Sequence, residues 1–588
     1  MRQFFKFLFA SCLGTIIALL VIAFVGTGLF SALARQTNQA PPISANSVLH
    51  LKLNQLIPEL ADNYEPSTIE LNQPTVLGLK DILDAIATAK HDPDIKGIFM
   101  ETDVVMSSFS NTIEIRKALL DFKASGKFIT AHAPYYSQGA YYLASAADRV
   151  TVAPLGLVDF RGFSAQIPFF RDLLSSVGVK MEVFDAGKFK SATEPYWRMD
   201  MSPESRLQTR VFLDGMYQIM LDDLAASRGL SQAQLRELAD TYAGIDAEQA
   251  LEGGLVDGVV YREAVLEDMR DQLGLDTDSK VKLVELNNYY QSRVTGSGYH
   301  SDKIALVIAE GTIVDGKGDP GQTGDLKYVK LIEDIRKNDH IKAVVLRVNS
   351  PGGSGAASDH IWQALTNLQE TGKPVIVSMG DYAASGGYYI SCGADMIYAQ
   401  PSTLTGSIGV FSVFPNMEGL LEDHLNIFID TVQTGPMAAG LTPFRELSPT
   451  QKALLQNRTD HLYDIFLQRV SDGRGLTKAE VDSIAQGRVW LGQDAIDIGL
   501  VDKLGGLDDA IAEAAERAGL SEYQLVTYPE PVDPLTRLLN ELLNQEEVIT
   551  RTMIQHRLGA GYESYRLLQE ILQSEGPQMR MPFVVPFE

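Results

Sequence analysis

The sequence predicts an α/β protein with two tandem homologous domains that follow an N-terminal transmembrane helix. Three observations lead to this fold class. An uncharged apolar stretch opens the chain, one set of short motifs occurs twice, and short apolar strands alternate with helical segments in each copy. At 588 residues, the chain is also too long for a single ordinary hydrophobic core.

Residues 1–36 predict a cytoplasmic stub and a membrane anchor. The stretch 7–34 holds no charged side chain, and its 28 positions exceed the roughly 20 that a helix needs to cross a bilayer. Arg2 and Lys6 precede it and favour a cytoplasmic N-terminus, so we expect the rest of the chain on the extracytoplasmic side. The Ala-Leu-Ala segment at 32–34 also resembles a signal-peptidase site, so cleavage of the anchor stays an alternative.

A duplication divides the remainder of the chain. Motifs recur in the same order at offsets between 245 and 247 residues, which predicts homologous domains at 45–297 and 300–527. The clearest pairs are Asp94-Ile95-Lys96 with His340-Ile341-Lys342, Gly139-Ala140-Tyr141-Tyr142 with Gly386-Gly387-Tyr388-Tyr389, and Gly254-Leu255-Val256-Asp257 with Gly499-Leu500-Val501-Asp502.

The second copy shows the α/β alternation most clearly. Apolar runs predict strands at 304–308, 343–348 and 375–378, and amphipathic patterns predict helices at 326–337 and 356–370. A tail follows at 528–588, with helical patterns at 535–543 and 549–571. Its last residues, 577–588, are apolar and rich in proline, so we expect them either to pack on a neighbouring subunit or to fray.

Ser385 is the candidate nucleophile. It follows an apolar strand that begins at Val375, and it precedes Gly386 and Gly387 at the start of a helical segment. A serine on such a turn presents its hydroxyl at a helix N-terminus, where backbone N–H groups can hold an oxyanion. A second glycine-rich strand end, at 349–353 (Asn-Ser-Pro-Gly-Gly), can direct further N–H groups at a carbonyl oxygen.

The first copy lacks both features. Gln138 occupies the position of Ser385, and the residues 103–106 replace the glycine-rich loop. A duplicated scaffold in which one copy has kept a serine and the other has not is typical of an enzyme with a single nucleophile.

Lys190 is the candidate base. A lysine whose pKa is lowered by burial can activate a serine, and Lys190 lies among small and apolar residues, whereas the second copy has Met437 at this position. The two copies are therefore complementary. Alternatives are Lys188 and a Ser-His arrangement with His360, His132 or His424. Cys392 is expected to be a buried small residue without a catalytic role.

Composition excludes several classes of function. The net charge of −25 argues against nucleic acid as a partner. Two cysteines and nine scattered histidines give no disulfide framework and no metal-ligand spacing, so we expect neither a metal nor another cofactor.

These motifs together resemble signal peptide peptidase A in its long bacterial form with two tandem domains. The strongest matches are 383–389 (AASGGYY), 403–409 (TLTGSIG), 349–353 (NSPGG) and 190–195 (KSATEP). The resemblance implies Clp-protease and crotonase-type domains and a membrane-bound serine protease, single-pass in the bacterial cytoplasmic membrane with its catalytic domains facing the periplasm. It further implies a homo-oligomer of four subunits that degrades signal peptides and other short apolar or unfolded peptides.

The resemblance also assigns the site residues. It implies Ser385 as the nucleophile, Lys190 as the general base and Ser407 as the residue that orients the lysine. It places the oxyanion among the backbone N–H groups of Gly352, Gly353 and Gly386. Two other classes stay open on the residues alone: a crotonase-type acyl-CoA or thioester enzyme, and a non-catalytic membrane scaffold.

Overall fold

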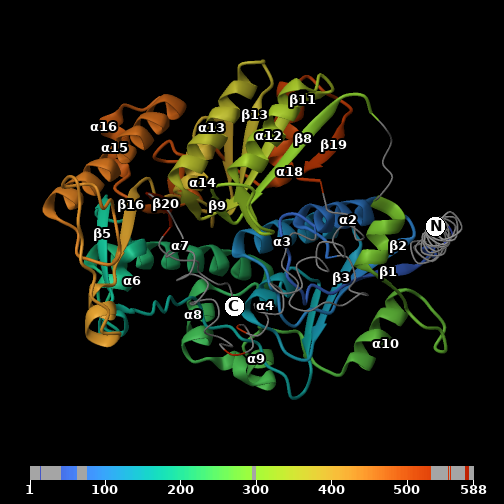
Figure 1. The fold of residues 1–588 in the computed structure, drawn as a ribbon. Coiled ribbons are helices and arrows are strands. Elements are labelled where there is room, and N and C mark those ends of the chain that lie inside the picture. Colours follow the sequence, from blue (N-terminus) through green and yellow to red (C-terminus); the bar gives the residue numbers. More distant parts are fainter. Residues whose placement is uncertain are drawn as a thin grey trace, which may run out of the picture.

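The computed structural model describes residues 14, 42–61, 76–294, 300–530, 554, 557 and 577–581. The predicted anchor at 7–34 and the predicted tail helix at 535–543 lie outside these residues, and of the helix at 549–571 only Ile554 and Arg557 are described. In the described ranges, no helix is both long and apolar enough to cross a membrane. The two repeats form α/β units on parallel sheets, coloured blue to green and yellow to red in Figure 1.

The first repeat is built on a six-stranded sheet in the order β6-β4-β3-β2-β1-β7, in which all neighbours are parallel. Its strands are β1 (Ser47–Leu51), β2 (Ile95–Met100), β3 (Phe128–Ala133), β4 (Arg149–Val152), β6 (Gly258–Val259) and β7 (Lys282–Glu285). Its helices are α2 (Leu79–His91), α3 (Phe109–Lys123), α4 (Gln138–Ala144), α5 (Arg171–Ser176), α6 (Glu194–Trp197), α7 (Pro203–Arg228), α8 (Gln232–Asp240), α9 (Ala247–Glu252), α10 (Arg262–Gln272) and α11 (Leu286–Tyr289).

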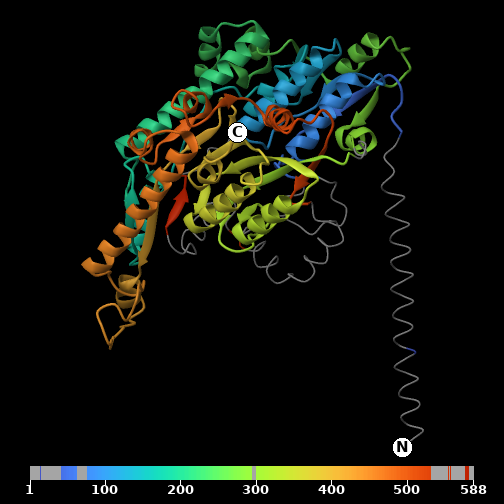
Figure 2. The same cartoon turned by 90° about the horizontal axis from the view of Figure 1, so that it is seen from above.

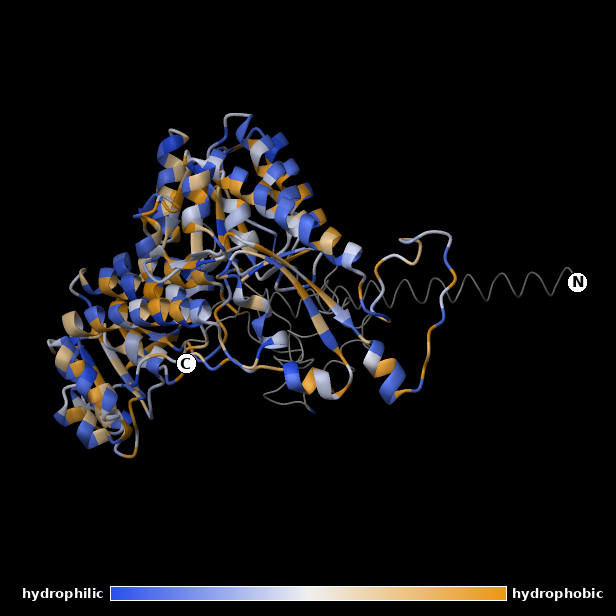
Figure 3. Ribbon diagram, turned by 90° about the vertical axis from the view of Figure 1, so that its left-hand side faces the viewer, coloured by the Kyte–Doolittle hydropathy of each residue, from blue (hydrophilic) through white to orange (hydrophobic). Residues whose placement is uncertain are grey.

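The second repeat carries an eight-stranded sheet in the order β17-β15-β13-β11-β8-β19, with β14 beside β13 and β18 beside β14. Its strands are β8 (Lys303–Glu310), β11 (Ile341–Ser350), β13 (Val375–Ala384), β14 (Met396–Ala399), β15 (Leu404–Gly406), β17 (Val489–Leu491), β18 (Lys503–Leu504) and β19 (Gln524–Tyr528). Its helices are α12 (Asp325–Lys337), α13 (Gly355–Gln369), α14 (Gly386–Ser391), α15 (Pro449–Arg474), α16 (Lys478–Ile484), α17 (Gly492–Ala495) and α18 (Leu507–Arg517). The helices in Figure 3 show blue and orange bands, as expected when one helix face packs on a sheet and the other faces water.

Equivalent contacts in the two units show that they are copies of one fold. The Tyr141 hydroxyl donates to the Leu255 carbonyl at 2.8 Å, and the Tyr388 hydroxyl donates to the Leu500 carbonyl at 2.9 Å. The long helices α7 and α15 each have 26 residues, begin after a serine cap and end at a glycine with φ near +67°. The tandem organisation predicted from the motif offsets is therefore present in the structure.

A third sheet joins the two repeats, in the order β10-β9-β12-β20-β16-β5. Its strands are β10 (Gln322–Gly324), β9 (Thr312–Val314), β12 (Gly352–Ser354), β20 (Gln578–Arg580), β16 (Val410–Asn416) and β5 (Lys180–Ala186). Strand β5 of the first repeat pairs antiparallel with β16 of the second over its whole length, and β5, β16 and β20 lie side by side in Figure 1. Of the segment 577–588, which we expected on a neighbouring subunit or frayed, only residues 577–581 are described, and Gln578–Arg580 form a strand inside this sheet.

A buried ionic cluster also holds the repeats together. Arg347, in the centre of β11, is fully buried and forms ion pairs with Glu59 at 2.9 Å and with Glu114 at 2.8 Å. Both carboxylates belong to the first repeat, and Asn111 of α3 accepts a further hydrogen bond from Arg347 at 2.9 Å. The guanidinium supplies donors in several directions, so that two buried carboxylates and an amide share one cation.

Candidate active site

Ser385 sits on a strained turn between β13 and α14. Its backbone has φ 56° and ψ −113°, outside the region that a residue with a side chain ordinarily adopts, and its N–H donates to the Gly406 carbonyl at 2.8 Å. A strained strand-to-helix turn is the device by which hydrolases present a nucleophilic serine. The Ser385 side chain is fully buried in this structure.

The two glycines after Ser385 are required by close packing. A Cβ atom at Gly386 would lie 2.6 Å from Ser358 Oγ, and one at Gly387 would lie 2.6 Å from the Ser350 carbonyl oxygen. The first turn of α14 therefore approaches the backbone of the 349–353 loop more closely than any side chain would permit. This approach brings the two glycine-rich segments predicted from the sequence into one site.

The pairing of β5 with β16 carries Lys190 to this turn. The chain leaves β5 at Ala186 and Phe189 N–H then donates to the Gln486 carbonyl at 2.8 Å, which fixes the backbone next to Lys190. Gly487 lies beneath the lysine: a Cβ atom there would be 2.7 Å from Lys190 Cβ. Gly487 has φ +76°, a left-handed conformation. The sequence analysis did not identify this residue, although glycine after a polar residue is a common signal of such a turn.

Lys190 contacts both candidate serines. Its Nζ atom lies 2.7 Å from Ser385 Oγ, 2.9 Å from the Ser407 carbonyl oxygen and 3.0 Å from Ser407 Oγ. Ser407 Oγ in turn donates to the Gly487 carbonyl at 3.3 Å. A neutral amine has two N–H donors and one lone pair, so it satisfies all three contacts by donating twice to Ser407 and accepting the Ser385 hydroxyl proton.

Burial favours this neutral form of Lys190. The side chain is 2% exposed, and burial lowers its pKa well below the ordinary value. None of the ion pairs found in the described part of the chain involves Lys190, so no carboxylate there offsets the cost of burying its charge. Lys190 and Ser385 together have the geometry of a base and its nucleophile, and burial favours the neutral amine that a base requires.

Ser407 occupies a second strained position. It has φ 47°, follows Gly406 at φ 75°, and its N–H donates to the Arg488 carbonyl at 2.7 Å. This conformation turns both its carbonyl and its hydroxyl towards Lys190. We expect Ser407→Ala to lower kcat for peptide hydrolysis about tenfold while leaving KM nearly unchanged, because the lysine loses one of its two acceptors but not its contact with Ser385.

The measurement is steady-state kinetics of the variant across pH, with Ser407→Thr as the control that restores the hydroxyl. A loss in Ser407→Ala that Ser407→Thr does not recover would show that the hydroxyl has no positioning role.

The three glycines predicted to hold the oxyanion, Gly352, Gly353 and Gly386, have different roles. Gly352 has φ +97°, and a Cβ atom there would lie 2.6 Å from Gly386 N, so this glycine provides space next to the Ser385 turn. Its own N–H, however, donates to Ser350 Oγ at 3.2 Å. Gly353 lies in β12, and Gly386 is the first residue of α14. This contact engages the Gly352 N–H, so Gly353 and Gly386 stay the predicted N–H donors, and Gly352 has a conformational part.

The alternative bases lie elsewhere. His360 is 60% exposed and pairs with Asp325 at 2.7 Å, His132 is buried against Thr151 in the first repeat, and His424 is exposed. Lys188 is exposed, with its ammonium over the Phe189 ring. Cys392 is buried, and burial raises the pKa of its thiol to about 12, so it remains protonated.

Gln138, the counterpart of Ser385 in the first repeat, is a structural residue. Its side-chain oxygen accepts from the N–H groups of Arg161 and Gly162 at 3.2 and 2.8 Å, and its amide donates to the Gly162 carbonyl at 3.1 Å. The first repeat thus uses this position to anchor a loop.

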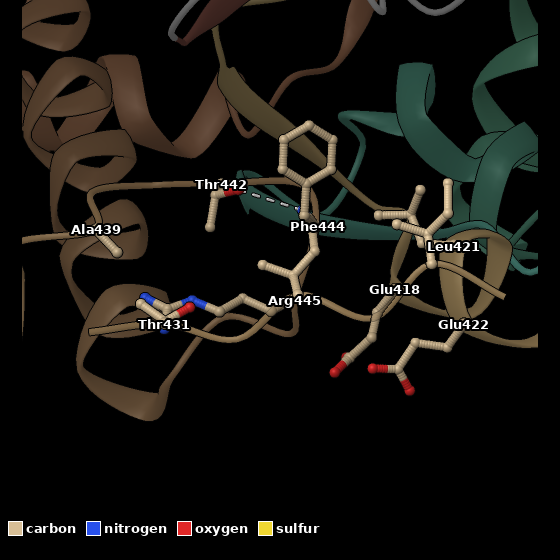
Figure 4. Close-up of a pocket in the computed structure, with 10 residues that line it drawn as sticks. Glu418, Leu421, Glu422, Thr431, Ala439, Thr442, Phe444 and Arg445 are labelled. Carbon is tan, nitrogen blue, oxygen red and sulfur yellow. Dashed lines mark hydrogen bonds between the residues drawn. The ribbon is translucent and has the colours of Figure 1, made fainter. Parts of the chain in front are cut away.

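A separate hollow lies in the segment after β16, away from Ser385 and Lys190. Figure 4 shows Arg445 reaching towards Thr431, with Glu418 and Glu422 at the edge of the hollow. Apolar side chains of the same segment are exposed: Leu425, Ile427, Phe428, Ile429, Val432, Leu441 and Phe444. Figure 2 shows this orange segment projecting from the body of the molecule.

Comparison with known proteins agrees with this site. The model of Peptidase family S49 matches residues 121–276 and 367–521, one region in each repeat. Protease 4 of Haemophilus influenzae is 36% identical over 476 residues, which cover 78% of this chain and 77% of the relative. Protease 4 of Salmonella typhi is 37% identical over 491 residues, with 82% and 79% covered.

A plant relative extends the comparison over more of the chain. The chloroplastic serine protease SPPA of Arabidopsis thaliana is 31% identical over 512 residues, which cover 86% of this chain and 74% of the relative. The resemblance to signal peptide peptidase A, read from the motifs, is confirmed. The chain is therefore a serine protease and belongs to peptidase family S49.

Proposed function

We propose that this chain is a membrane-anchored endopeptidase that hydrolyses cleaved signal peptides and other short apolar or unfolded peptides with a Ser385/Lys190 dyad. The observation that carries the proposal is the 2.7 Å contact between Lys190 Nζ and Ser385 Oγ, made by a buried lysine that forms no ion pair with any described residue. The names of the relatives support a protease, and the apolar stretch at 7–34 supports a place at the membrane.

The mechanism follows from the contacts of the dyad. Neutral Lys190 takes the hydroxyl proton of Ser385 as Oγ attacks a peptide carbonyl carbon, and the N–H groups of Gly353 and Gly386 stabilise the oxyanion. The Lys190 ammonium then protonates the leaving amine, and the C–N bond breaks to leave an acyl ester on Ser385. Water, deprotonated by Lys190, attacks the ester carbon. The bond to Ser385 Oγ breaks, and the Lys190 ammonium returns its proton to Oγ as the second product leaves.

We extend the proposal to a homo-oligomer, a tetramer by the resemblance. Large exposed apolar patches mark interaction surfaces, and the projecting segment after β16 carries a largely exposed Phe428 and a fully exposed Val432. A ring of subunits that buries these side chains would also enclose the sites, which suits a protease beside a membrane.

The pH dependence of peptide hydrolysis tests the dyad. We expect kcat/KM for a fluorescence-quenched apolar peptide to fall as the pH drops through the lowered pKa of Lys190, because protonation removes the base. Ser385→Ala should abolish hydrolysis, and His360→Ala should keep both the rate and the profile. A rate that is lost in His360→Ala would transfer the base to histidine, and full activity in Ser385→Ala would refute the proposed nucleophile.

A further inference from the structure

The pairing of β11 with β13 is irregular just before the active site. The two strands are parallel neighbours; β11 runs into the 349–353 loop and β13 runs into the Ser385 turn. Their register shifts at Asn349, which alone lies opposite the three residues 380–382 of β13. A bulge leaves backbone groups without ladder partners and changes the direction of its strand, and bulges are frequent beside active sites. The irregularity therefore helps to set where the loop and the nucleophile turn lie relative to each other.

The Asn349 side chain bridges this irregularity. Its oxygen accepts from the Tyr382 N–H at 3.1 Å, in place of a ladder hydrogen bond. On the other side, the Asn349 carbonyl accepts from the Gly311 N–H, after β8, at 2.9 Å. Tyr382 and Asn349 each stand three residues before a residue of the site, Ser385 and Gly352 respectively. The bridge therefore fixes the spacing of the two segments at the point where both leave the sheet.

A carboxylate of the first repeat orients the Asn349 amide. Asn349 Nδ2 donates to Glu59 Oε1 at 3.1 Å, and the buried Glu59 side chain is itself held by its ion pair with Arg347. Gly380, inside the irregular stretch of β13, makes room for this carboxylate: a Cβ atom there would lie 2.7 Å from Glu59 Oε1. An amide that accepts through its oxygen and donates through its nitrogen is fixed in one orientation.

The first repeat has a different contact at the position aligned with Asn349. Asp103 occupies it, and its carboxylate accepts from the N–H of the next residue, Val104, at 3.1 Å. An ionised carboxylate has no donor, so it cannot link a donor to an acceptor as an amide does. An amide at this position thus occurs in the repeat that has the glycine-rich loop and the serine turn.

We infer that Asn349, held by Glu59, is a positioning residue for peptide hydrolysis, which keeps the N–H groups of the glycine-rich loop at a fixed distance from Ser385 Oγ. The inference rests on the proposed function of the dyad. It means that the first repeat acts on the site twice, since it supplies Lys190 and also holds the loop of the second repeat. Misplaced oxyanion donors weaken binding of the transition state more than binding of the substrate, so the effect belongs to kcat rather than to KM.

Steady-state kinetics of Asn349→Leu tests the positioning role. Leucine has a similar volume and removes both side-chain hydrogen bonds, so we expect kcat for a fluorescence-quenched apolar peptide to fall roughly 10²-fold, with KM within about twofold of the parent. Asn111→Leu is the matched control, because Asn111 accepts from Arg347 in the same buried cluster but on the side of α3. It should lower the midpoint of denaturant unfolding and leave kcat unchanged. An equal fall of kcat in both variants, or no fall in Asn349→Leu, would overturn the inference.

An exchange of the two partners tests the part of Glu59. Asn349→Asp removes the donor and places a second carboxylate beside Glu59, so kcat should fall. The added substitution Glu59→Gln returns an N–H donor opposite a carboxylate and restores the net charge of the cluster. We expect kcat to recover about tenfold relative to Asn349→Asp alone. A double variant no faster than Asn349→Asp would overturn the assignment of Glu59 as the support of Asn349.

Amide hydrogen exchange separates this inference from the proposed function, because it needs no catalysis. The Tyr382 N–H should exchange about tenfold faster in Asn349→Leu than in the parent, since its acceptor is gone, whereas Asn111→Leu should leave this rate unchanged. If the parent hydrolyses no peptide, the proposed function fails. Faster exchange at Tyr382 in Asn349→Leu alone would then still support the bridge, and an unchanged rate would overturn it.

Discussion

Lys190→Met is expected to lower peptide hydrolysis roughly 10³- to 10⁴-fold, close to the effect of removing the nucleophile, because residues that act as one catalytic unit fail together. Methionine retains the apolar volume of the buried side chain and is the residue, Met437, that the second repeat has at the aligned position. The measurement is kcat for a quenched peptide. Lys188→Met is the matched control: Lys188 is exposed, two residues away, and its loss should leave kcat unchanged.

The same variant should also change how the free energy of unfolding depends on pH. Below pH 10.5 an unfolded chain protonates Lys190, whereas the folded chain keeps it neutral until its lowered pKa is reached. Folding therefore releases a proton over this window, and the parent loses about 1.4 kcal/mol of stability per pH unit as the pH falls through it. Lys190→Met has no amine that takes up a proton on unfolding. Its stability relative to the parent should therefore rise as the pH falls. A constant difference across pH would mean that Lys190 is charged in the folded chain.

Arg347→Met is expected to destabilise the chain by about 3–5 kcal/mol, because it leaves two buried carboxylates without their cation. Arg347 pairs with Glu59 and Glu114, and burial already raises the pKa of the Glu114 carboxyl. The measurement is the midpoint of denaturant unfolding followed by circular dichroism. Arg336→Met, which removes a half-buried surface pair with Glu333, should change the midpoint little. A midpoint that moves equally little in Arg347→Met would show that the cluster does not join the repeats.

Local sequence patterns predicted the elements well, and they pointed to Ser385 as the candidate nucleophile. The strands expected at 304–308 and 343–348 are the cores of β8 and β11, because continuous β-branched runs between turns leave few alternatives. Ser385 was identifiable because its turn is local: the strand, the glycines and the helix follow one another directly. Lys190 was found only by comparing the copies, since no local pattern distinguishes a lysine that burial makes neutral from a solvated one.

What the sequence did not predict depends on pairings between distant segments. The position of Gly487 beneath Lys190 depends on a loop almost 300 residues further along the chain. The cluster of Arg347, Glu59 and Glu114 joins charged residues from distant parts of the chain, and no local sequence pattern distinguishes any of them. The segment 577–588 has an apolar, proline-rich sequence with no core of its own. The place of its described strand, Gln578–Arg580, depends on pairing with β12 and β16, which lie far from it in the sequence.

The antiparallel pairing of β5 with β16 has an evolutionary consequence. A gene duplication ordinarily leaves two copies that can be lost, moved or recombined independently of each other. In the proposed dyad, one copy contributes the strand that leads to Lys190 and the other contributes Ser385, so deletion of either copy would remove the pair. Neither copy could then be lost without the other, and independent units would require at least a serine in place of Gln138 and a lysine in place of Met437.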